Sequence, residues 1–585
     1  CGLMVYHANA SDRPATAIGY ESRLFGDEVI TLEIITDESN WQSMLNNAEA
    51  KPWISVDIII NGERFSNVGV RTKGNSTLSG RGGGFGGSSR DGRYSLQIKF
   101  NKFVKGQTYY GLDAFCVNNM SGDSTYMKDY LAYDIMSYIG VEAPLTNFAN
   151  VSVNGEHYSF GVALERYDKA YLGRAYSTSA GELYSVKIGF GRRQEFEDMR
   201  LDDDELADMR ANMRRDVQNI FVGNVGEEIP ENMDEMPRGG QGGGFGGARP
   251  EDMGDMPRGD QNGRGGGFGG DREIPEGGFP GGGFPEGGFP EGGFPEGGFP
   301  EGGFPGMPNG EQPEGNEGFG NRGGGFGGGM FGGRGGGGSL QYTDGEISSY
   351  SAIFDNAVFN PSDKDKQRVI TALENLNNGT DLEKYFDVDQ ILRYFAAHTV
   401  VVNADSYTSN MQQNYYIYER NGQISVLPWD YGLAFGGFMA GEATSSVNFP
   451  IDTPVSGVNM EDRPLLDKLL AVDEYRERYH GYLQEIVDGY FASGRWESTI
   501  KALDEKINAY VKNDATATSS YAQYEESLPV LTEFGKLRAE SIQGQLDGNI
   551  PSTTDGQRAD SSALVDASHL NMSLLGTMGG GMMRR

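Results

Sequence analysis

A glycine-rich stretch between about Arg238 and Gly338 constrains the fold of this 585-residue chain more than any other feature. It holds a large share of the 89 glycines, and the unit Glu-Gly-Gly-Phe-Pro recurs from Glu286 to Pro305. Glycine loses more conformational entropy on ordering than other residues, and proline lacks an amide donor, so this stretch cannot build a packed core. We therefore predict a disordered insert over residues 191–340, between two packed regions.

The two packed regions differ in their hydrophobic patterns. Before the insert, short β-type runs alternate with turns, and Asn-Gly dipeptides at positions 61 and 154 indicate hairpins. After the insert, helical periodicity dominates, with one further hairpin around an Asn-Gly dipeptide at 421. These patterns predict an α+β protein with two lobes, an antiparallel β-rich N-lobe and a helical C-lobe. The expected segments are a tether (1–20), the β-rich lobe (21–164), a hinge and start of the C-lobe (165–190), the insert (191–340), the helical lobe (341–548) and a flexible tail (549–585).

The net charge of −34 restricts the possible partners. Nucleic acids need a basic surface, so they are not expected to bind, although the Arg-Gly-Gly units of the insert are also found in RNA-binding segments. Anionic lipids are disfavoured by the same charge. ATP stays possible, because lysines, backbone amides and a metal ion near the phosphates can bind it locally. No apolar run approaches the roughly 20 residues of a membrane span.

Two cysteines are present, Cys1 and Cys116. Cys1 followed by glycine is typical of a bacterial lipoprotein, whose first cysteine is acylated; alternatively, the sequence simply begins with a cysteine here. The first interpretation predicts an extracytoplasmic protein that meets a membrane only through a lipid on Cys1. Cys116 lies in an apolar context, so we expect it to be a small buried hydrophobic residue.

Acidic and amide side chains are spaced around the hairpin of the helical region. Asp405 follows an apolar helix, Asn410 comes five residues later, and the second strand of the hairpin leads to Asp430. Phosphoryl transfer to a hydroxyl needs a carboxylate near that hydroxyl and oxygen ligands for magnesium. Loop Asp and Asn residues also satisfy turns and caps. Trp429 beside Asp430 favours a paired or metal-bound acid.

Several blocks resemble the CotH kinase family. They include Asn-Tyr-Tyr-Ile-Tyr (414–418), Pro-Trp-Asp-Tyr (428–431) and Ala-Phe-Gly (434–436). The resemblance implies an atypical, secreted protein-kinase-like fold that binds ATP with a divalent metal and phosphorylates protein Ser/Thr. Further matching blocks lie at 69–77, 98–100, 126–140, 143–144, 161–168, 181–184 and 463–466.

The resemblance implies roles for three of these residues. Asp405 resembles the family's catalytic acid and Asp430 its metal-binding residue. Protein kinases place an asparagine five residues after the catalytic aspartate, so Asn410 is the expected second ligand of Mg²⁺ or Mn²⁺. The family's block usually ends in an aspartate where this chain has Gly432, a difference that could weaken metal binding or alter the choice of metal.

The nucleotide is expected to lie against the first lobe. Lys99, on a predicted strand, is a candidate phosphate ligand, or else an exposed strand lysine. Its acidic partner is not identified; Asp129 and Asp134 lie on a suitable helix. His398 is expected to be a packed core histidine. Other candidate nucleotide-binding residues are Arg71 and Lys73 for phosphate contact, Asn75 and Ser76 in a loop that offers backbone amides, and Glu165 near the adenine edge or the hinge.

Two classes of function remain open at this point. The first is an ATP-dependent kinase acting on a protein substrate at the cell or spore surface, with magnesium or manganese. The second is a catalytically weak surface scaffold on a kinase-like fold, with the insert as its working part. A metal-dependent hydrolase lacks the histidine clusters that such sites often use.

Overall fold

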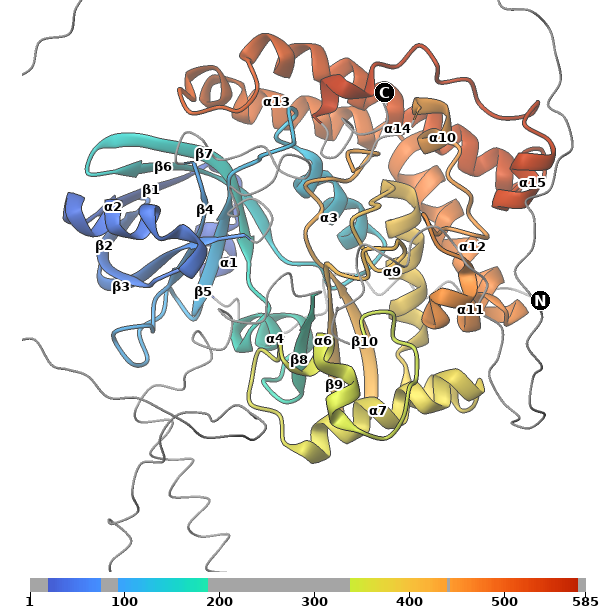
Figure 1. The fold of residues 1–585 in the computed structure, drawn as a ribbon. Coiled ribbons are helices and arrows are strands. Elements are labelled where there is room, and N and C mark those ends of the chain that lie inside the picture. Colours follow the sequence, from blue (N-terminus) through green and yellow to red (C-terminus); the bar gives the residue numbers. More distant parts are fainter. Residues whose placement is uncertain (1–18, 75–92, 188–336, 439–441, 577–585) are drawn as a thin grey trace, which may run out of the picture. The chain divides into compact units, whose positions relative to one another are not determined.

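The computed structural model describes residues 19–74, 93–187, 337–438 and 442–576, which belong to one compact unit (Figure 1). Most of the predicted insert, Asn75 and Ser76 of the predicted phosphate loop, and Cys1 lie outside the described residues.

A closed β-barrel forms the first part of the fold, in the strand order β1-β2-β3-β4-β5-β7-β6. Neighbouring strands are antiparallel, except that β1 and β6 pair in parallel, with Ile30 opposite Ala149, and so close the barrel. Closure leaves no free sheet edge, which an open sheet would have to protect. The strands are β1 (Ile30–Ile35), β2 (Ile54–Ile60), β3 (Glu63–Lys73), β4 (Ser95–Lys99), β5 (Ala114–Asn118), β6 (Thr146–Val153) and β7 (Glu156–Glu165).

The three predicted Asn-Gly hairpin turns are present. At positions 61, 154 and 421 the asparagine has φ of 50°, 51° and 55°, and the glycine that follows has φ of 87°, 85° and 90°. Positive φ at both central residues is the geometry of a type I′ turn, whose twist matches that of the flanking strands. The N-terminal region is therefore β-rich, as predicted.

Apolar and polar side chains alternate along the strands. The apolar side chains fill the barrel, and the polar ones lie on its outer face. Val70 and Ile98 are buried in the barrel core. Lys73, Arg71 and Lys99 alternate with buried residues on β3 and β4, so they lie on the outside of the barrel. This face of β3 and β4 carries the cationic side chains that the sequence singled out.

The second part is mainly helical and contains a small antiparallel sheet in the order β10-β9-β8. Strand β8 (Glu182–Val186) precedes the predicted insert, whereas β9 (Tyr415–Arg420) and β10 (Gln423–Pro428) follow it. The two packed regions predicted from the sequence therefore share one sheet. The helices before the insert are α1 (Tyr20–Leu24), α2 (Glu38–Asn46), α3 (Lys128–Tyr138) and α4 (Lys169–Tyr176). Those after it are α6 (Ser351–Phe354), α7 (Asp363–Asn378), α8 (Leu382–Tyr385), α9 (Val388–Val401), α10 (Ala443–Val447), α11 (Pro464–Leu470), α12 (Asp473–Ile486), α13 (Arg495–Asn513), α14 (Tyr521–Leu546) and α15 (Thr554–Ala559).

Helix α3 joins β5 to β6 of the barrel, yet it packs beside α9 of the helical part (Figure 1). Leu131 and Ile135 on α3 and Ile391 and Phe395 on α9 belong to one buried cluster. Burying a leucine, isoleucine or phenylalanine side chain contributes about 1.5–3 kcal/mol each. This packing fixes α3 against the segment that follows α9, where the candidate site lies.

The C-terminal segment corrects one prediction. Residues 549–585 were expected to be a flexible tail, but Val565, Ala567 and Leu575 are buried. The amide of Val565 donates to Asn448 Oδ1 (3.0 Å), and Lys128 Nζ donates to the carbonyl of Gly576 (2.9 Å). The many Ser, Asp and Thr residues of this segment suggested a solvated tail, whereas its few apolar residues pack onto the helical part. Residues 577–585 lie outside the described part.

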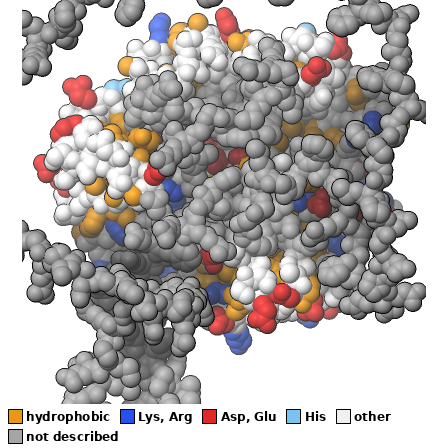
Figure 2. Space-filling view, in the orientation of Figure 1, with side chains coloured by type: hydrophobic (Ala, Val, Ile, Leu, Met, Phe, Trp, Pro, Cys, Tyr) orange, Lys and Arg blue, Asp and Glu red, His pale blue; other side chains and the backbone are white. Residues whose placement is uncertain are grey.

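The charged surface is mixed in sign. On the face shown in Figure 2, acidic and basic side chains are interspersed over the described surface. None of the described helices combines the length and the hydropathy that crossing a bilayer requires.

A buried ion pair links the barrel to the helical part. Arg93 Nη1 lies 2.6 Å from Asp514 Oδ2, and both side chains are almost fully buried. His157 Nε2 lies 2.9 Å from the other carboxylate oxygen, and Arg93 also donates to the carbonyls of Asn119 and Phe160. Burial raises the pKa of Asp514, but the Arg93 charge and the hydrogen bonds from His157, Arg93 and Thr516 hold it below 3.8.

We predict that Asp514→Asn lowers the free energy of unfolding at neutral pH by about 3–5 kcal/mol, because it leaves the Arg93 guanidinium buried without a counter-charge. A depressed carboxyl pKa stabilises the fold above the unfolded pKa, and this stabilisation is lost as the pH falls through the folded pKa. The difference between wild type and variant should therefore shrink below about pH 4. Urea unfolding at neutral and acidic pH measures it. Asp473→Asn, at an exposed carboxylate, is the control; a pH-independent difference would contradict the prediction.

Candidate functional site

The candidate site begins where α9 ends in a strained turn. Val402, directly after the helix, has φ of 47°, an unfavourable conformation for a β-branched residue. The turn buries Asn403, whose Oδ1 accepts the amide of Asp405 (3.1 Å) and whose Nδ2 donates to the carbonyl of Asp430 (3.1 Å). One asparagine side chain thus ties together the two loops that carry the predicted aspartates.

Asp405 is a half-buried carboxylate held by two amides. Gln413 Nε2 donates to Oδ1 (2.7 Å) and Asn414 Nδ2 donates to Oδ2 (3.0 Å). Burial raises the pKa of Asp405 to about 6, the negative charge of Asp430 adds to the rise, and the two amide bonds oppose it. The two aspartates therefore lie close enough for their charges to interact, as the predicted site requires.

Asp430 has an exposed side chain on a fixed backbone. Its φ is 62°, in the left-handed region. Its amide donates to the hydroxyl of Tyr133 (3.0 Å), and the next amide, of Tyr431, donates to Asp129 Oδ1 (2.9 Å). Tyr133 and Asp129 both lie on α3. The helix thereby determines the position of the Asp430 carboxylate.

A chain of hydrogen bonds leads from this loop to the barrel. Asn118, at the end of β5, donates from Nδ2 to Asp129 Oδ2 (3.0 Å) and accepts at Oδ1 from Lys73 Nζ (2.7 Å). The Lys73 ammonium also lies 5.2 Å from the ring centroid of Trp429, the residue before Asp430. Burial raises the pKa of Asp129 to about 7, and the charge of Asp430 adds to the rise. Lys73 is thus the lysine that the structure connects to the aspartate loop.

The other predicted cations lie elsewhere on the outer face of the barrel. Arg71 donates from Nε to Gln97 Oε1 (3.0 Å), and its guanidinium lies 4.5 Å from the ring centroid of Trp53. Lys99 pairs across the sheet with Gly69. Burial raises the pKa of Asp113, and the charge of Lys99 opposes that rise, so Lys99 lies near Asp113.

Glu165 and Asp134 hold elements of the fold together. Glu165 is buried and accepts from Tyr20 (2.6 Å), from Arg174 (2.7 Å) and from the amide of Leu145 (3.1 Å), which joins β7 to α1 and α4. Asp134, the alternative to Asp129 as the acidic partner of a lysine, accepts from the hydroxyl of Tyr490 (2.6 Å).

Asn410 is exposed, and its backbone amide donates to the carbonyl of Ser456 (3.2 Å). Among the residues that the structure describes, no group of three or more His, Cys, Asp and Glu side chains could hold a metal ion. The donors near Asp430 still suit magnesium, which takes one or two carboxylates and fills its remaining positions with water and substrate phosphates. The oxygen chemistry of Asp430 and Asn410, the two predicted ligands, therefore fits a divalent cation.

Arg463 stabilises the loop between Asp405 and Asn410 through hydrogen bonds to the carbonyls of that loop. Its buried guanidinium donates from Nε to the carbonyl of Tyr407 (2.6 Å) and from Nη2 to the carbonyl of Ser409. Burial lowers its pKa. Buried carbonyls without partners would cost about 1–3 kcal/mol each, so Arg463 stabilises the loop conformation.

His398 is a packed core histidine, as expected. Its ring nitrogens lie 2.8 Å from the hydroxyl of Tyr431 and 3.0 Å from that of Thr408, and burial lowers its pKa to about 3. Asn403, Gln413, Asn414 and Asn118 were not predicted from the sequence. Asn403 lies only two residues before Asp405, a position typical of a side chain that caps a turn.

The fold and site together define an α+β protein in which paired loop aspartates are connected, through α3, to a lysine on a β-barrel. The family model described as CotH kinase protein matches residues 70–222 and 335–542, and the chain belongs to this family. A curated relative, the inner spore coat protein H of Bacillus subtilis (strain 168), is 25% identical over 169 residues. That match spans 28% of this chain and 43% of the relative, less than half of its length.

We predict that Asn403→Ala lowers the free energy of unfolding by about 1–3 kcal/mol, since it removes the two hydrogen bonds that the buried Asn403 side chain makes to the amide of Asp405 and the carbonyl of Asp430. The amide of Asp405 should also exchange with solvent faster, which hydrogen-exchange mass spectrometry can follow. Asn377→Ala, at an exposed position of α7, should change neither quantity. Unchanged protection of the 403–406 segment in the Asn403 variant would contradict the bridging role.

Proposed function

We propose that this protein is an ATP-dependent, metal-requiring phosphotransferase that phosphorylates Ser/Thr hydroxyls of proteins. In this proposal the barrel is the N-lobe and the helical part with its three-stranded sheet is the C-lobe of a kinase-like fold. The observation that carries it is the Asn403 bridge, which brings Asp405 and Asp430 together beside the bonded series Lys73, Asn118 and Asp129. Membership of the CotH kinase family supports it.

Each residue has a role that its surroundings suit. Asp405, whose carboxylate oxygens are oriented by Gln413 and Asn414, would orient the substrate hydroxyl and take its proton. A pKa of about 6 keeps this carboxyl mostly ionised at neutral pH, yet more basic than an ordinary aspartate. Asp430, exposed on a rigid backbone, would hold the metal, with Asn410 as the second candidate ligand.

A bound Mg²⁺ or Mn²⁺ would supply charge neutralisation for the nucleotide phosphates. Lys73 would bind a phosphate oxygen as a point charge on the barrel side. Lys99, Arg71, Asn75, Ser76 and Glu165 stay predictions as further nucleotide contacts. The carboxylate oxygens of Glu165 are already taken by Tyr20, Arg174 and Leu145, so a nucleotide would have to share them.

The curated relative is named as an inner spore coat protein, which supports a location at a cell or spore surface; we propose that the protein substrate lies there too. The charge of −34 suits a protein substrate with basic segments around its target hydroxyl, because opposite charges speed up encounter.

We expect Asp405→Asn and Asp430→Asn each to lower phosphate transfer by about 100-fold or more, because one removes the acceptor of the hydroxyl proton and the other a metal ligand. Incorporation of labelled phosphate from ATP with Mg²⁺ or Mn²⁺, into the protein itself and into Ser/Thr peptides, measures the effect. Asp473→Asn is the matched control, at an exposed aspartate of α12. A wild-type protein that labels neither itself nor any peptide would favour a scaffold on the same fold.

A second prediction distinguishes Lys73 from Lys99 as the lysine that contacts the phosphates. ATP with magnesium at about 100 times its Kd should raise the free energy of unfolding of the wild type by about 2.7 kcal/mol. Lys73→Met should abolish most of this stabilisation, whereas Lys99→Met should keep it, since Lys73 is the lysine bonded to the Asp129 network. Lys105→Met, at an exposed lysine, is the control. Stabilisation that survives in Lys73→Met but not in Lys99→Met would assign the phosphate contact to Lys99.

A further inference from the structure

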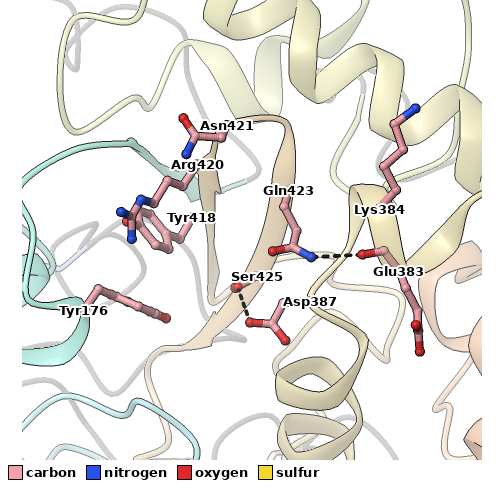
Figure 3. A pocket seen from close by; sticks show the side chains of 9 residues that line it. All are labelled: Tyr176, Glu383, Lys384, Asp387, Tyr418, Arg420, Asn421, Gln423 and Ser425. Carbon is pink, nitrogen blue, oxygen red and sulfur yellow. Dashed lines mark hydrogen bonds between the residues drawn. The ribbon is translucent and has the colours of Figure 1, made fainter.

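A second concave site lies at the far end of the β9–β10 hairpin. It is a pocket of about 490 Å³, within the range of roughly 300–1,000 Å³ that is typical of small-molecule sites. Its lining residues are Tyr176, Glu383, Lys384, Asp387, Tyr418, Arg420, Asn421, Gln423 and Ser425, and none of the predicted catalytic or nucleotide-binding residues is among them (Figure 3).

The floor of the pocket is one face of the hairpin. Tyr418 pairs across the strands with Ser425, and Arg420 pairs with Gln423, so these four side chains lie on the same face. Tyr176, on α4, contributes one wall, and its ring centroid lies 4.5 Å from that of Tyr418. In Figure 3 the Tyr176 side chain extends into the space between Tyr418 and Asp387. Its hydroxyl oxygen is buried and makes no hydrogen bond to the described protein atoms.

The remaining wall comes from the segment that leads into α9. Asp387 caps the start of this helix by accepting the amide of Gln390 (3.3 Å), and it also accepts from Ser425 Oγ (3.5 Å). Gln423 Nε2 donates to the carbonyl of Glu383 (3.0 Å). These bonds hold the planar groups of the pocket in place, so the site is preorganised.

The chemistry of the lining excludes several classes of ligand. No Ala, Val, Leu, Ile or Met side chain lines the pocket, so apart from the tyrosine rings it offers little apolar surface for a lipid tail. The Lys384 and Glu383 side chains point away from the space between Tyr418 and Asp387 (Figure 3), and they bond to Tyr385 and Arg478. One cation, Arg420, and one carboxylate, Asp387, remain, so the formal charges cancel and no excess charge favours a phosphate or a nucleotide.

An extended peptide is also disfavoured. Such peptides add to a free strand edge, where unpaired backbone groups supply the hydrogen bonds. Here β9 is the central strand of its sheet, and beside β10 the chain forms a parallel bridge from Phe386 to Ile424. The amide of Asp387 donates to the carbonyl of Ile424 (2.8 Å), so the edge is bonded where it borders the pocket.

A neutral ligand that is rich in hydroxyl groups fits the polar lining that these exclusions leave, whose formal charges cancel. Each sugar hydroxyl donates one hydrogen bond and accepts others, so it needs donors and acceptors side by side. The pocket supplies donors from Arg420, an acceptor from Asp387, and groups of both kinds from its amides and hydroxyls. The tyrosine rings present rigid amphipathic faces, which can pack against the C–H face of a sugar ring. We propose that this pocket is a binding site for a neutral saccharide.

The saccharide site is connected to the candidate catalytic site through an aromatic cluster on the same sheet face. Tyr418, Tyr416 and Trp429 belong to one buried cluster, and the ring centroids of Tyr416 and Trp429 are 5.5 Å apart. Trp429 directly precedes Asp430. A surface glycan bound at the hairpin tip would therefore hold the catalytic part of the protein beside glycan-bearing structures, without occupying the aspartate site.

The test uses the full chain and three defined trisaccharides as probes: chitotriose, maltotriose and cellotriose. Saturation-transfer NMR and calorimetry should detect saturable binding of at least one of them, without ATP or metal. The double variant Arg420→Ala/Gln423→Ala, at two exposed positions, should weaken that binding by at least about tenfold. The matched control Lys364→Ala/Gln367→Ala removes the same two kinds of group from an exposed face of α7 and should leave binding unchanged.

Three results would overturn the proposal. These are no binding of any trisaccharide up to about 20 mM, equal binding by wild type and the pocket variant, or tighter binding of inorganic phosphate than of any trisaccharide at this pocket. Coincident unfolding transitions of the variants and wild type establish that each variant is folded. Because no phosphate transfer is measured, the outcome does not depend on the proposed kinase activity.

Discussion

Two hydrogen bonds from helix α3 to the backbone of the Asp430 loop determine the geometry on which the rest of the site depends. The amides of Asp430 and Tyr431 are held by Tyr133 and Asp129, on a helix that lies in sequence between two barrel strands. The same carboxylate of Asp129 reaches Lys73 through Asn118. A single short helix therefore sets the distance between the barrel lysine and the loop aspartate, and any displacement of α3 would move both.

The site combines local strain with buried polar support. Val402, Asn414, Asp430 and Phe435 all have positive φ values, which cost of order 1–3 kcal/mol each for residues other than glycine. Such conformations persist only where several contacts with the surrounding structure hold the backbone in place. Asn403, Arg463 and the α3 contacts provide that support by satisfying buried backbone groups on both loops. Strained positions of this kind in the segment that carries the aspartates are common where side chains must be aimed at a ligand.

The sequence predicted features that depend on local chemistry. The Asn-Gly turns, the β-rich and helical regions, the proximity of Asp405 and Asp430 and the core position of His398 followed from turn preferences, periodicity and motif order. Parallel pairing of β1 with β6 could not be predicted, because it depends on contacts between residues far apart in the chain. The choice of Lys73 over Lys99 as the lysine connected to the aspartate loop depends on Asn118, an ordinary strand-end residue in the sequence. The packed C-terminal segment was missed because its few apolar residues are diluted by polar ones.

Strand β8 pairs with β9, with Val186 opposite Tyr415, although the whole glycine-rich insert lies between them in the chain. The β8–β9 pairing therefore brings together the two ends of the chain segment that contains the predicted insert, and the entropy of such a closure grows only with the logarithm of the number of residues between the ends. Each doubling costs about 0.6 kcal/mol more. Copies of the Glu-Gly-Gly-Phe-Pro unit could thus be gained or lost over generations with little thermodynamic penalty for the packed part of the fold. The same closure imposes an order on synthesis: a ribosome must translate the entire repeat before β8 can find its partner, so the sheet forms late.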